Sequence, residues 1–157
     1  MVTNMILHVP DETLRAISFD DPPRGDSLTI GRPRGPLAAR PLFGLLYCFS
    51  WRDVRRTAEC AVERTGLGYN DSGFRYPSDL DPCEESFEGV NVYDPLDDIL
   101  VSLPAFEEVM SRFFRALIAG AEKHGDPVRS EPWWPEFVRL AEELAARVAK
   151  EAQGLSR

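Results

Sequence analysis

Carboxylates dominate the part of this sequence whose residue types could do chemistry. Six of them could gather around a divalent cation: Asp79, Asp81, Glu84, Glu85, Asp97 and Asp98. Oxygen ligands of this kind suit Mg²⁺ and Ca²⁺, so a small metal-dependent hydrolase is one interpretation. The spacing is not that of an EF-hand loop, because neither the central glycine nor the final glutamate stands in register. We therefore expect no metal and no cofactor.

Cysteine and histidine offer a second route to catalysis. A thiol nucleophile among Cys48, Cys60 and Cys83 would need His8 or His124 as its base. Cys48 and Cys60 stand in apolar sequence, which favours inert core thiols. The sequence has no serine-hydrolase elbow, zinc-protease motif or phosphate-binding glycine loop. We expect a protein that is not an enzyme.

The acidic residues are concentrated in one segment. Between Tyr76 and Ser111 there is no Lys or Arg, while the rest of the chain holds all 18 basic residues against 16 acidic ones. The ten carboxylates of the segment are Asp79, Asp81, Glu84, Glu85, Glu88, Asp94, Asp97, Asp98, Glu107 and Glu108. Their field reaches about 8 Å at physiological salt, so it acts on a partner that docks directly. The alternative is a solvated acidic face without a partner.

Composition limits the remaining classes of function. The 157 residues fit a single domain over 1–157, and a hydrophobic content of 43% is enough for a core. The sequence has no apolar run near the ~20 residues that span a bilayer and no basic secretory signal at its start. A net charge of −8 disfavours nucleic acid and anionic membranes as direct partners. The three cysteines, odd in number, indicate reduced thiols and a cytoplasmic protein.

The N-terminal third predicts short strands and a loop. Residues 5–9 and 14–19, separated by Pro-Asp-Glu, predict a hairpin, and residues 28–30 predict a third strand. The Pro- and Arg-rich residues 31–41 predict irregular structure that could fold back as a counterion of the acidic segment. Residues 42–49 are continuously apolar, which suits a buried strand or the start of a helix equally.

A helix is predicted over residues 51–65. Ser50 and Asp53 have the form of a capping box at its start, and Gly66 suits its left-handed end. Residues 74–76 predict a short strand that Pro77 ends, and Pro82 keeps the loop of residues 78–87 from being helical.

The second half predicts a hairpin and two long helices. Residues 89–93 and 99–103 predict strands joined by a turn at 94–98, whose carboxylates point outward. Ser102 or Leu103 caps the next helix, which ends at residues 124–127, and a last helix runs from Pro135 to about residue 153. The result is an α+β fold: a small, mainly antiparallel sheet packed against about three helices. The apolar face of the first long helix is Phe106, Val109, Met110, Phe113, Phe114, Leu117 and Ile118.

A series of motifs follows one another between residues 66 and 118. A glycine-aromatic loop (Gly66 to Tyr69) precedes an aromatic-Pro-x-Asp-Leu motif (Tyr76 to Leu80), the acidic loop, a Phe-Glu-Gly-Val strand entry (Phe87 to Val90) and an aspartate-rich turn into an aromatic-lined helix. This order resembles the immunity proteins of contact-dependent growth inhibition systems, in particular those that neutralise ribonuclease toxins. The resemblance covers about residues 50–120, and Pro95 departs from it in the turn.

The resemblance implies a cytoplasmic, non-catalytic monomer that binds the toxic domain of a matching effector one to one. A ribonuclease holds a polyanion, so its cleft is basic, and a surface bearing carboxylates could occupy it. The turn at 94–98 and the loop at 78–88 together suffice for an interface of about 800 Å² per partner, with tyrosines as anchors. The expected toxin-binding residues are Tyr69, Asp71, Tyr76, Asp79, Asp81, Glu84, Glu85, Tyr93, Asp94, Asp97 and Asp98. An acidic binding module or scaffold subunit unrelated to toxins is the alternative.

Overall fold

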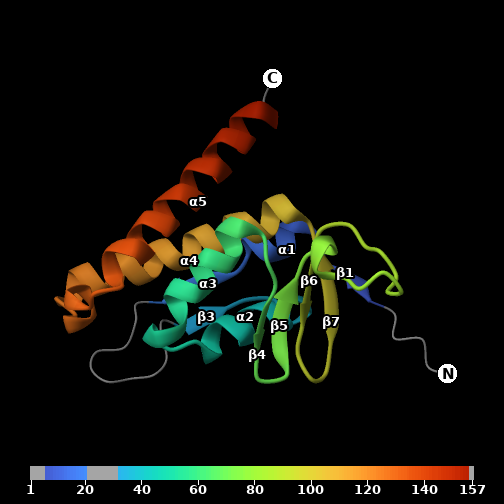
Figure 1. Cartoon of the computed structure of the whole chain (residues 1–157), viewed down its shortest axis with the longest axis horizontal. Helices are drawn as coiled ribbons and strands as arrows, with labels where there is room; N and C mark the ends of the chain where they lie inside the picture. Colours follow the sequence, from blue (N-terminus) through green and yellow to red (C-terminus); the bar gives the residue numbers. More distant parts are fainter. Residues whose placement is uncertain (1–5, 21–31, 156–157) are drawn as a thin grey trace.

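The structure, a computed structural model, describes residues 6–20 and 32–155 and confirms the α+β fold (Figure 1). The strands of the main sheet are, in spatial order, β1 (Leu7–His8), β7 (Asp98–Val101), β6 (Val90–Tyr93), β5 (Ser72–Arg75) and β4 (Leu67–Tyr69). Only the β1–β7 pair is parallel within this sheet. The α-helices are α1 (Asp11–Arg15), α2 (Arg40–Cys48), α3 (Trp51–Glu63), α4 (Leu103–His124) and α5 (Trp134–Leu155). In Figure 1, α5 extends obliquely away from the sheet toward its C-terminal end.

The predicted N-terminal hairpin is wrong. Residues 11–15 form α1, and the flanking strands pair elsewhere: β1 with β7, and β2 (Ser18–Asp20) with β3 (Arg32–Arg34). The helix is favoured because Asp11 and Glu12 stand in its first turn, where carboxylates interact well with the helix dipole. The strand predicted at residues 28–30 lies outside the described residues.

The Pro- and Arg-rich segment is more regular than predicted. It contains β3, the 3₁₀ helix η1 (Leu37–Ala39) and the start of α2, where Pro41 stands at a position that needs no N–H donor. The sequence predicts either a strand or the start of a helix for residues 42–49, and the structure shows that they are largely helical. Leu42, Leu45 and Leu46 are buried on one face of α2 at helical spacing.

The predicted capping of α3 is confirmed, although the helix ends early. The Asp53 carboxylate accepts hydrogen bonds from the backbone N–H and the hydroxyl of Ser50, at 2.9 and 2.8 Å. The left-handed C-terminal residue is Arg64, with φ of 55°, and not Gly66. Gly66 is needed for another reason: a Cβ there would lie 2.9 Å from Asp79 Oδ2.

The register of the main sheet sorts its side chains onto two faces. One row faces the helices, and its Phe74 ring lies 5.1 Å from that of Phe106 on α4. This inner row is Leu67, Phe74, Val92 and Ile99. Because side chains alternate along a strand, the adjacent rows point to the outer face. The outer rows are Gly68, Gly73, Tyr93 and Asp98, and Arg75, Asn91, Leu100 and His8.

The two long helices agree with the prediction to within a few residues. The Ser102 hydroxyl accepts the N–H of Ala105 at the start of α4, and Gly125, with φ of 59°, ends it. The 3₁₀ helix η3 (Pro127–Ser130) then leads to α5, which continues past the predicted end through Gly154.

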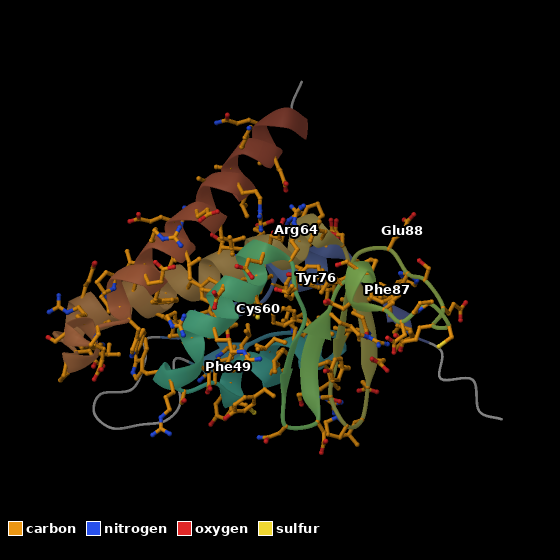
Figure 2. All side chains as sticks on the ribbon, in the orientation of Figure 1. Phe49, Cys60, Arg64, Tyr76, Phe87 and Glu88 are labelled. Atoms are coloured by element: carbon orange, nitrogen blue, oxygen red, sulfur yellow. The ribbon has the colours of Figure 1, made fainter. Side chains whose placement is uncertain are left out.

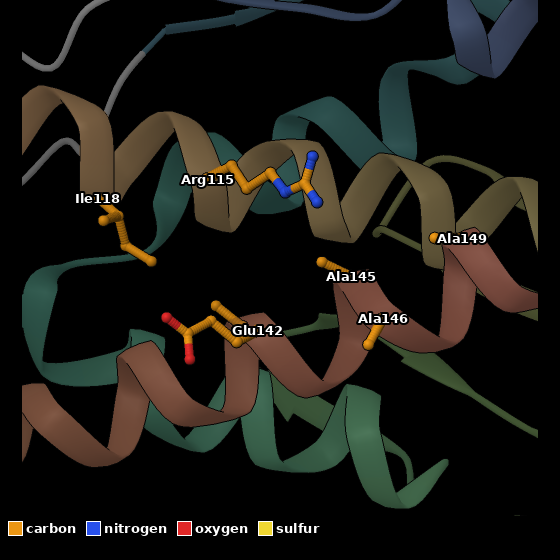
Figure 3. Close-up of a pocket in the computed structure, with 7 residues that line it drawn as sticks. Arg115, Ile118, Glu142, Ala145, Ala146 and Ala149 are labelled. Atoms are coloured by element: carbon orange, nitrogen blue, oxygen red, sulfur yellow. The ribbon is translucent and has the colours of Figure 1, made fainter.

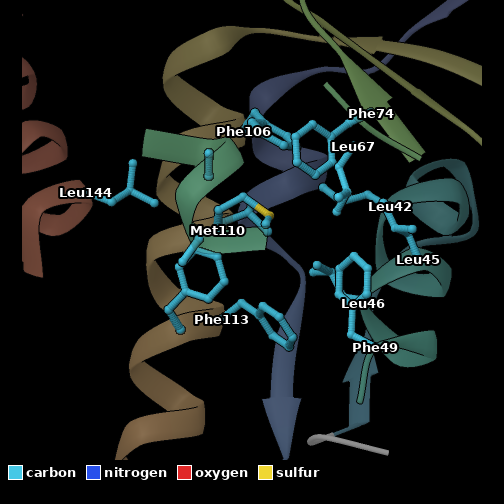
Figure 4. Close-up of a cluster of buried hydrophobic side chains, with 14 of the residues drawn as sticks. Leu42, Leu45, Leu46, Phe49, Leu67, Phe74, Phe106, Met110, Phe113 and Leu144 are labelled. Atoms are coloured by element: carbon cyan, nitrogen blue, oxygen red, sulfur yellow. The ribbon is translucent and has the colours of Figure 1, made fainter. Parts of the chain in front are cut away.

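The core lies between the helices and the inner face of the sheet, and α3 and α5 contribute buried side chains to it beside α2 and α4 (Figure 4). Every member of the predicted α4 face is buried except Ile118, which is partly buried. Trp134 is buried beside Phe137, with ring centroids 5.3 Å apart. The core therefore fixes the sheet whose loops and turns carry the predicted binding residues.

Candidate protein-binding surface

The hairpin tip, residues 94–97, uses its carboxylates within the molecule. Asp94 Oδ1 accepts the backbone N–H groups of Leu96 and Asp97, at 2.8 and 2.7 Å. Arg40 Nη2 lies 3.3 Å from Asp94 Oδ2 and 2.5 Å from Asp97 Oδ2. The predicted internal counterion is therefore confirmed at Arg40, and the tip is a fixed and partly neutralised end of the sheet.

The acidic loop, residues 78–88, is held in place at two points. At its start, in the 3₁₀ helix η2 (Pro77–Asp79), Asp79 Oδ2 accepts the backbone N–H of Tyr76 at 2.7 Å. Further on, Glu84 accepts the backbone N–H of Asp81 at 2.9 Å and pairs with Arg75 at 3.1 Å. These two interactions lower the pKa of the Glu84 carboxyl, the bond from Asp81 most. The loop is thus ordered although, as predicted, it is not an α-helix.

The remaining carboxylates of the acidic loop are free. Asp81, Glu85 and Glu88 are exposed, and within residues 6–20 and 32–155 no ion pair reaches any of them. Figure 2 shows Glu88 projecting away from the ribbon. Of the predicted carboxylates, Asp94 and Asp97 at the tip and Asp79 and Glu84 on the loop thus have partners, whereas Asp81 and Glu85 are available, together with Glu88, which was not predicted.

A polar network on the outer face ties the acidic loop to the sheet. Asn91 is buried; its Oδ1 accepts from Arg75 Nε at 2.9 Å, and its Nδ2 donates to Asp98 Oδ1 at 3.0 Å. Because Arg75 also pairs with Glu84, the chain of contacts runs from the loop across β5 and β6 to β7. Asp98 therefore also has a structural partner. Asn91 was not among the predicted residues, and its position inside a short strand is the only signal that could have suggested it.

Two of the three predicted anchor tyrosines remain partly accessible. Tyr93 lies over the glycines of the outer face: a Cβ on Gly73 would be 2.7 Å from its hydroxyl, and one on Gly68 3.7 Å. Tyr69 packs edge-on against Phe49, with ring centroids 5.6 Å apart. Of the pair, Tyr93 is the better placed to contact a partner that covers the outer face.

Tyr76 is wrongly assigned to the binding surface, because its side chain belongs to the core. Only 3% of the residue is exposed, and its ring packs against Phe74 and Phe106. Its hydroxyl is buried and has no hydrogen-bond partner among the residues that the structure describes. Burial, and next the charge of Glu107, raise the pKa of the Tyr76 hydroxyl far above its usual value. The sequence around Tyr76, an aromatic residue just before a proline, contains no signal that its side chain is buried.

The predicted residues occupy opposite ends of the sheet. The chain enters β6 from the acidic loop and leaves it at the hairpin tip, so the length of this four-residue strand, about 13 Å at roughly 3.3 Å per residue, separates the two. Asp71, in the turn between β4 and β5, lies at the same end as the hairpin tip (Figure 1). A partner that contacts both ends must extend along the sheet.

Sequence reasoning missed a buried ion cluster that joins α3, α4 and α5. Glu107 of α4 is 1% exposed and accepts from Arg64 Nη2 at 2.8 Å and from Arg147 Nη2 of α5. Arg64 also pairs with Glu151 at 3.2 Å, and the hydrogen bond to Glu107 is the largest cause that raises the pKa of Arg64. The signal was present: Glu107 stands three residues before Met110, within the apolar face of α4.

None of the three cysteines is paired in a disulfide. Cys48 and Cys83 are exposed, so the prediction of a core position is wrong for Cys48. Cys60 is half-buried, and burial raises the pKa of its thiol, which disfavours the reactive thiolate. In the part of the chain that is described, no set of three His, Cys, Asp or Glu side chains is grouped to hold a metal ion. No helix among the same residues has the length and apolarity needed to cross a membrane.

One shallow groove of about 290 Å³ lies between α4 and α5 (Figure 3). Alanines of α5 line most of it, while Arg115 and Glu142 supply its charged groups. It contains no nucleophile with a neighbouring base. No family model, curated protein or solved structure matches this chain.

Proposed function

We propose that this chain is an immunity protein that binds and neutralises the cationic, RNA-cleaving domain of a cognate effector in the cytoplasm. The observation that supports this function is the acidic loop, which is fixed to the sheet yet leaves Asp81, Glu85 and Glu88 exposed and unpaired. A loop already ordered loses little conformational entropy when it binds. Its free charges are ready to meet an opposite charge.

Inhibition follows from competition for a basic cleft. A ribonuclease must hold the phosphates of its substrate, so cationic side chains line its active site. Carboxylates placed there exclude RNA, and complementary fields speed the encounter of the two proteins. The same charges would serve an acidic binding module unrelated to toxins, so a test of binding must be joined to a test of protection.

The test uses the C-terminal domain encoded by the gene immediately upstream. We expect the purified chain to form a one-to-one complex with that domain, measured by calorimetry. Cells that express the domain should survive only when this chain is co-expressed. Absence of binding to it would reject the immunity function, and binding without protection would favour the unrelated acidic module.

The three free carboxylates give the sharpest variant. Asp81→Lys, Glu85→Lys and Glu88→Lys together should slow association and weaken binding at least tenfold, because attraction becomes repulsion. Asp79 and Glu84 are kept because they hold the loop. The matched control changes exposed glutamates elsewhere by the same total charge: Glu122→Lys, Glu131→Lys and Glu142→Lys. Equal losses in both variants would mean that net charge matters and the loop does not.

A further inference from the structure

We propose that Leu96 of the hairpin tip and Leu37 of η1, just before α2, form the apolar anchor of the interface with the effector domain. This inference rests on the proposed function. Leu37 of η1 is 83% exposed, and Leu96 of the tip is 77% exposed. The two leucines are far apart in sequence. Arg40 brings their segments together, because it stands one 3₁₀ turn after Leu37 and pairs with Asp97, the neighbour of Leu96. The two most exposed large hydrophobic side chains of the described residues thus belong to two segments that one ion pair joins.

Both leucines are displayed on fixed backbone. The tip is closed by Asp94, whose carboxylate accepts two backbone N–H groups and whose own N–H donates to the carbonyl of Asp97 at 2.9 Å. On the other side, Ala39 of η1 is completely buried. An apolar side chain held rigidly in water does not stabilise the fold. It contributes when a partner covers it, at a small entropic cost.

The charges around the leucines indicate which kind of partner covers them. Asp71, Asp94 and Asp97 lie at this end of the sheet, where Arg40 pairs with Asp94 and Asp97 and where Arg34 stands three residues before Leu37. A second copy of the chain would bring two negative tips together, which costs free energy. The partner that fits is a basic protein surface with an apolar depression. The leucines enter the depression, and a cationic side chain of the partner reaches Asp97, whose side chain is half exposed. The cationic domain of the proposed function has this charge.

The test is Leu37→Ser with Leu96→Ser, titrated by calorimetry into the C-terminal domain encoded immediately upstream. We expect a loss of affinity of at least about tenfold, as for the removal of central apolar contacts. Tyr47→Ser is the matched control: Tyr47 is exposed on the same helix, about 10 Å along it from Arg40 at 1.5 Å per residue. Circular dichroism and the melting temperature confirm that each variant is folded.

Each outcome has one meaning. Reduced binding by the double leucine variant, with Tyr47→Ser unchanged, supports the anchor. Unchanged binding by the leucine variant overturns the anchor, and the immunity function then stands if the loop variant still weakens binding. A wild-type chain that does not bind this domain overturns both proposals. Dimerisation of the free chain that the leucine substitutions abolish would also overturn the anchor, because the occupant would be a second copy.

Discussion

The carboxylate of Glu107 and the guanidinium of Arg147 meet at the point where α3, α4 and α5 converge. Arg147 donates to Glu107 Oε2 and also to the carbonyls of Ala61 and Val62, at 3.0 and 2.9 Å. Those carbonyls belong to the last turns of α3, where a cation is favourable for the helix dipole. One side chain of α5 therefore satisfies a buried charge on α4 and the end of α3.

Removal of the Glu107 charge should destabilise the fold. Glu107→Gln leaves two guanidinium groups without their buried partner. We expect a loss of roughly 2–3 kcal/mol, less than for a fully buried pair because both arginines keep contact with water. Urea denaturation measures it. The control is Glu108→Gln, which removes an exposed pair with Arg15 and should cost less than about 1 kcal/mol. Equal costs would contradict a special role for Glu107.

Two glycines should respond to alanine in opposite directions. A Cβ at Gly73 would collide with the carbonyl of Leu67 and with the Tyr93 hydroxyl, so Gly73→Ala should cost about 3 kcal/mol or more. Gly44 is inside α2 with open space around it, so Gly44→Ala should stabilise the protein by up to about 1 kcal/mol. Melting temperatures of the two variants are the measurement, and a tolerated Gly73→Ala would show that Tyr93 does not lie across β5.

Replacing Tyr76 with phenylalanine should leave stability unchanged or raise it by about 1 kcal/mol, because the buried hydroxyl has no partner to lose in the described residues. Binding should not change, since the ring is in the core. Weaker binding by Tyr76→Phe would return this residue to the interface.

The same variant tests a pH dependence. Burial raises the pKa of Tyr76 in the folded state, while in the unfolded state it ionises near its usual value of about 10. The contribution of Tyr76 to stability is therefore complete below about pH 10 and is lost as the pH rises through the folded-state pKa. We expect wild type to lose stability faster than Tyr76→Phe above pH 10 in urea melts. Parallel curves would mean that the hydroxyl is hydrated.

Phe113 should be among the most costly core truncations. Its ring is buried between Phe19 and Phe114, with centroids 5.5 and 5.7 Å away. Phe113→Ala should cost about 3–5 kcal/mol in equilibrium unfolding. Phe87, a partly exposed residue of the acidic loop, is the matched control, and its replacement by alanine should cost clearly less. Similar values for the two would mean that the packing of α4 is wrongly described.

Local chemistry explains which parts of the fold could be predicted. The capping residue Ser102, the helix end at Gly125 and the apolar repeat of α4 are signals within a few residues, and all three are confirmed. The hairpin of β6 and β7 was likewise predictable, because strand, turn and strand follow one another directly.

Long-range partners explain the failures. Leu7 and His8 pair with β7, more than ninety positions away, and no local pattern contains that pairing. The binding surface failed for a related reason. Whether a carboxylate is free depends on partners such as Arg40 for Asp97, or Asn91 for Asp98, and these come from other elements. The sequence therefore shows where the acidic residues are, but which of their carboxylates are free to bind a partner depends on the fold.

The dependence of α3 and α4 on Arg147 has a consequence for synthesis of the chain. Until that arginine leaves the ribosome, the emerging polypeptide holds a Glu107 that has only Arg64 as its cation, and the carbonyls at the end of α3 lack their guanidinium donor. The nascent domain therefore cannot complete its assembly while α5 is still in the exit tunnel. Messages truncated before this codon should yield products that proteases remove.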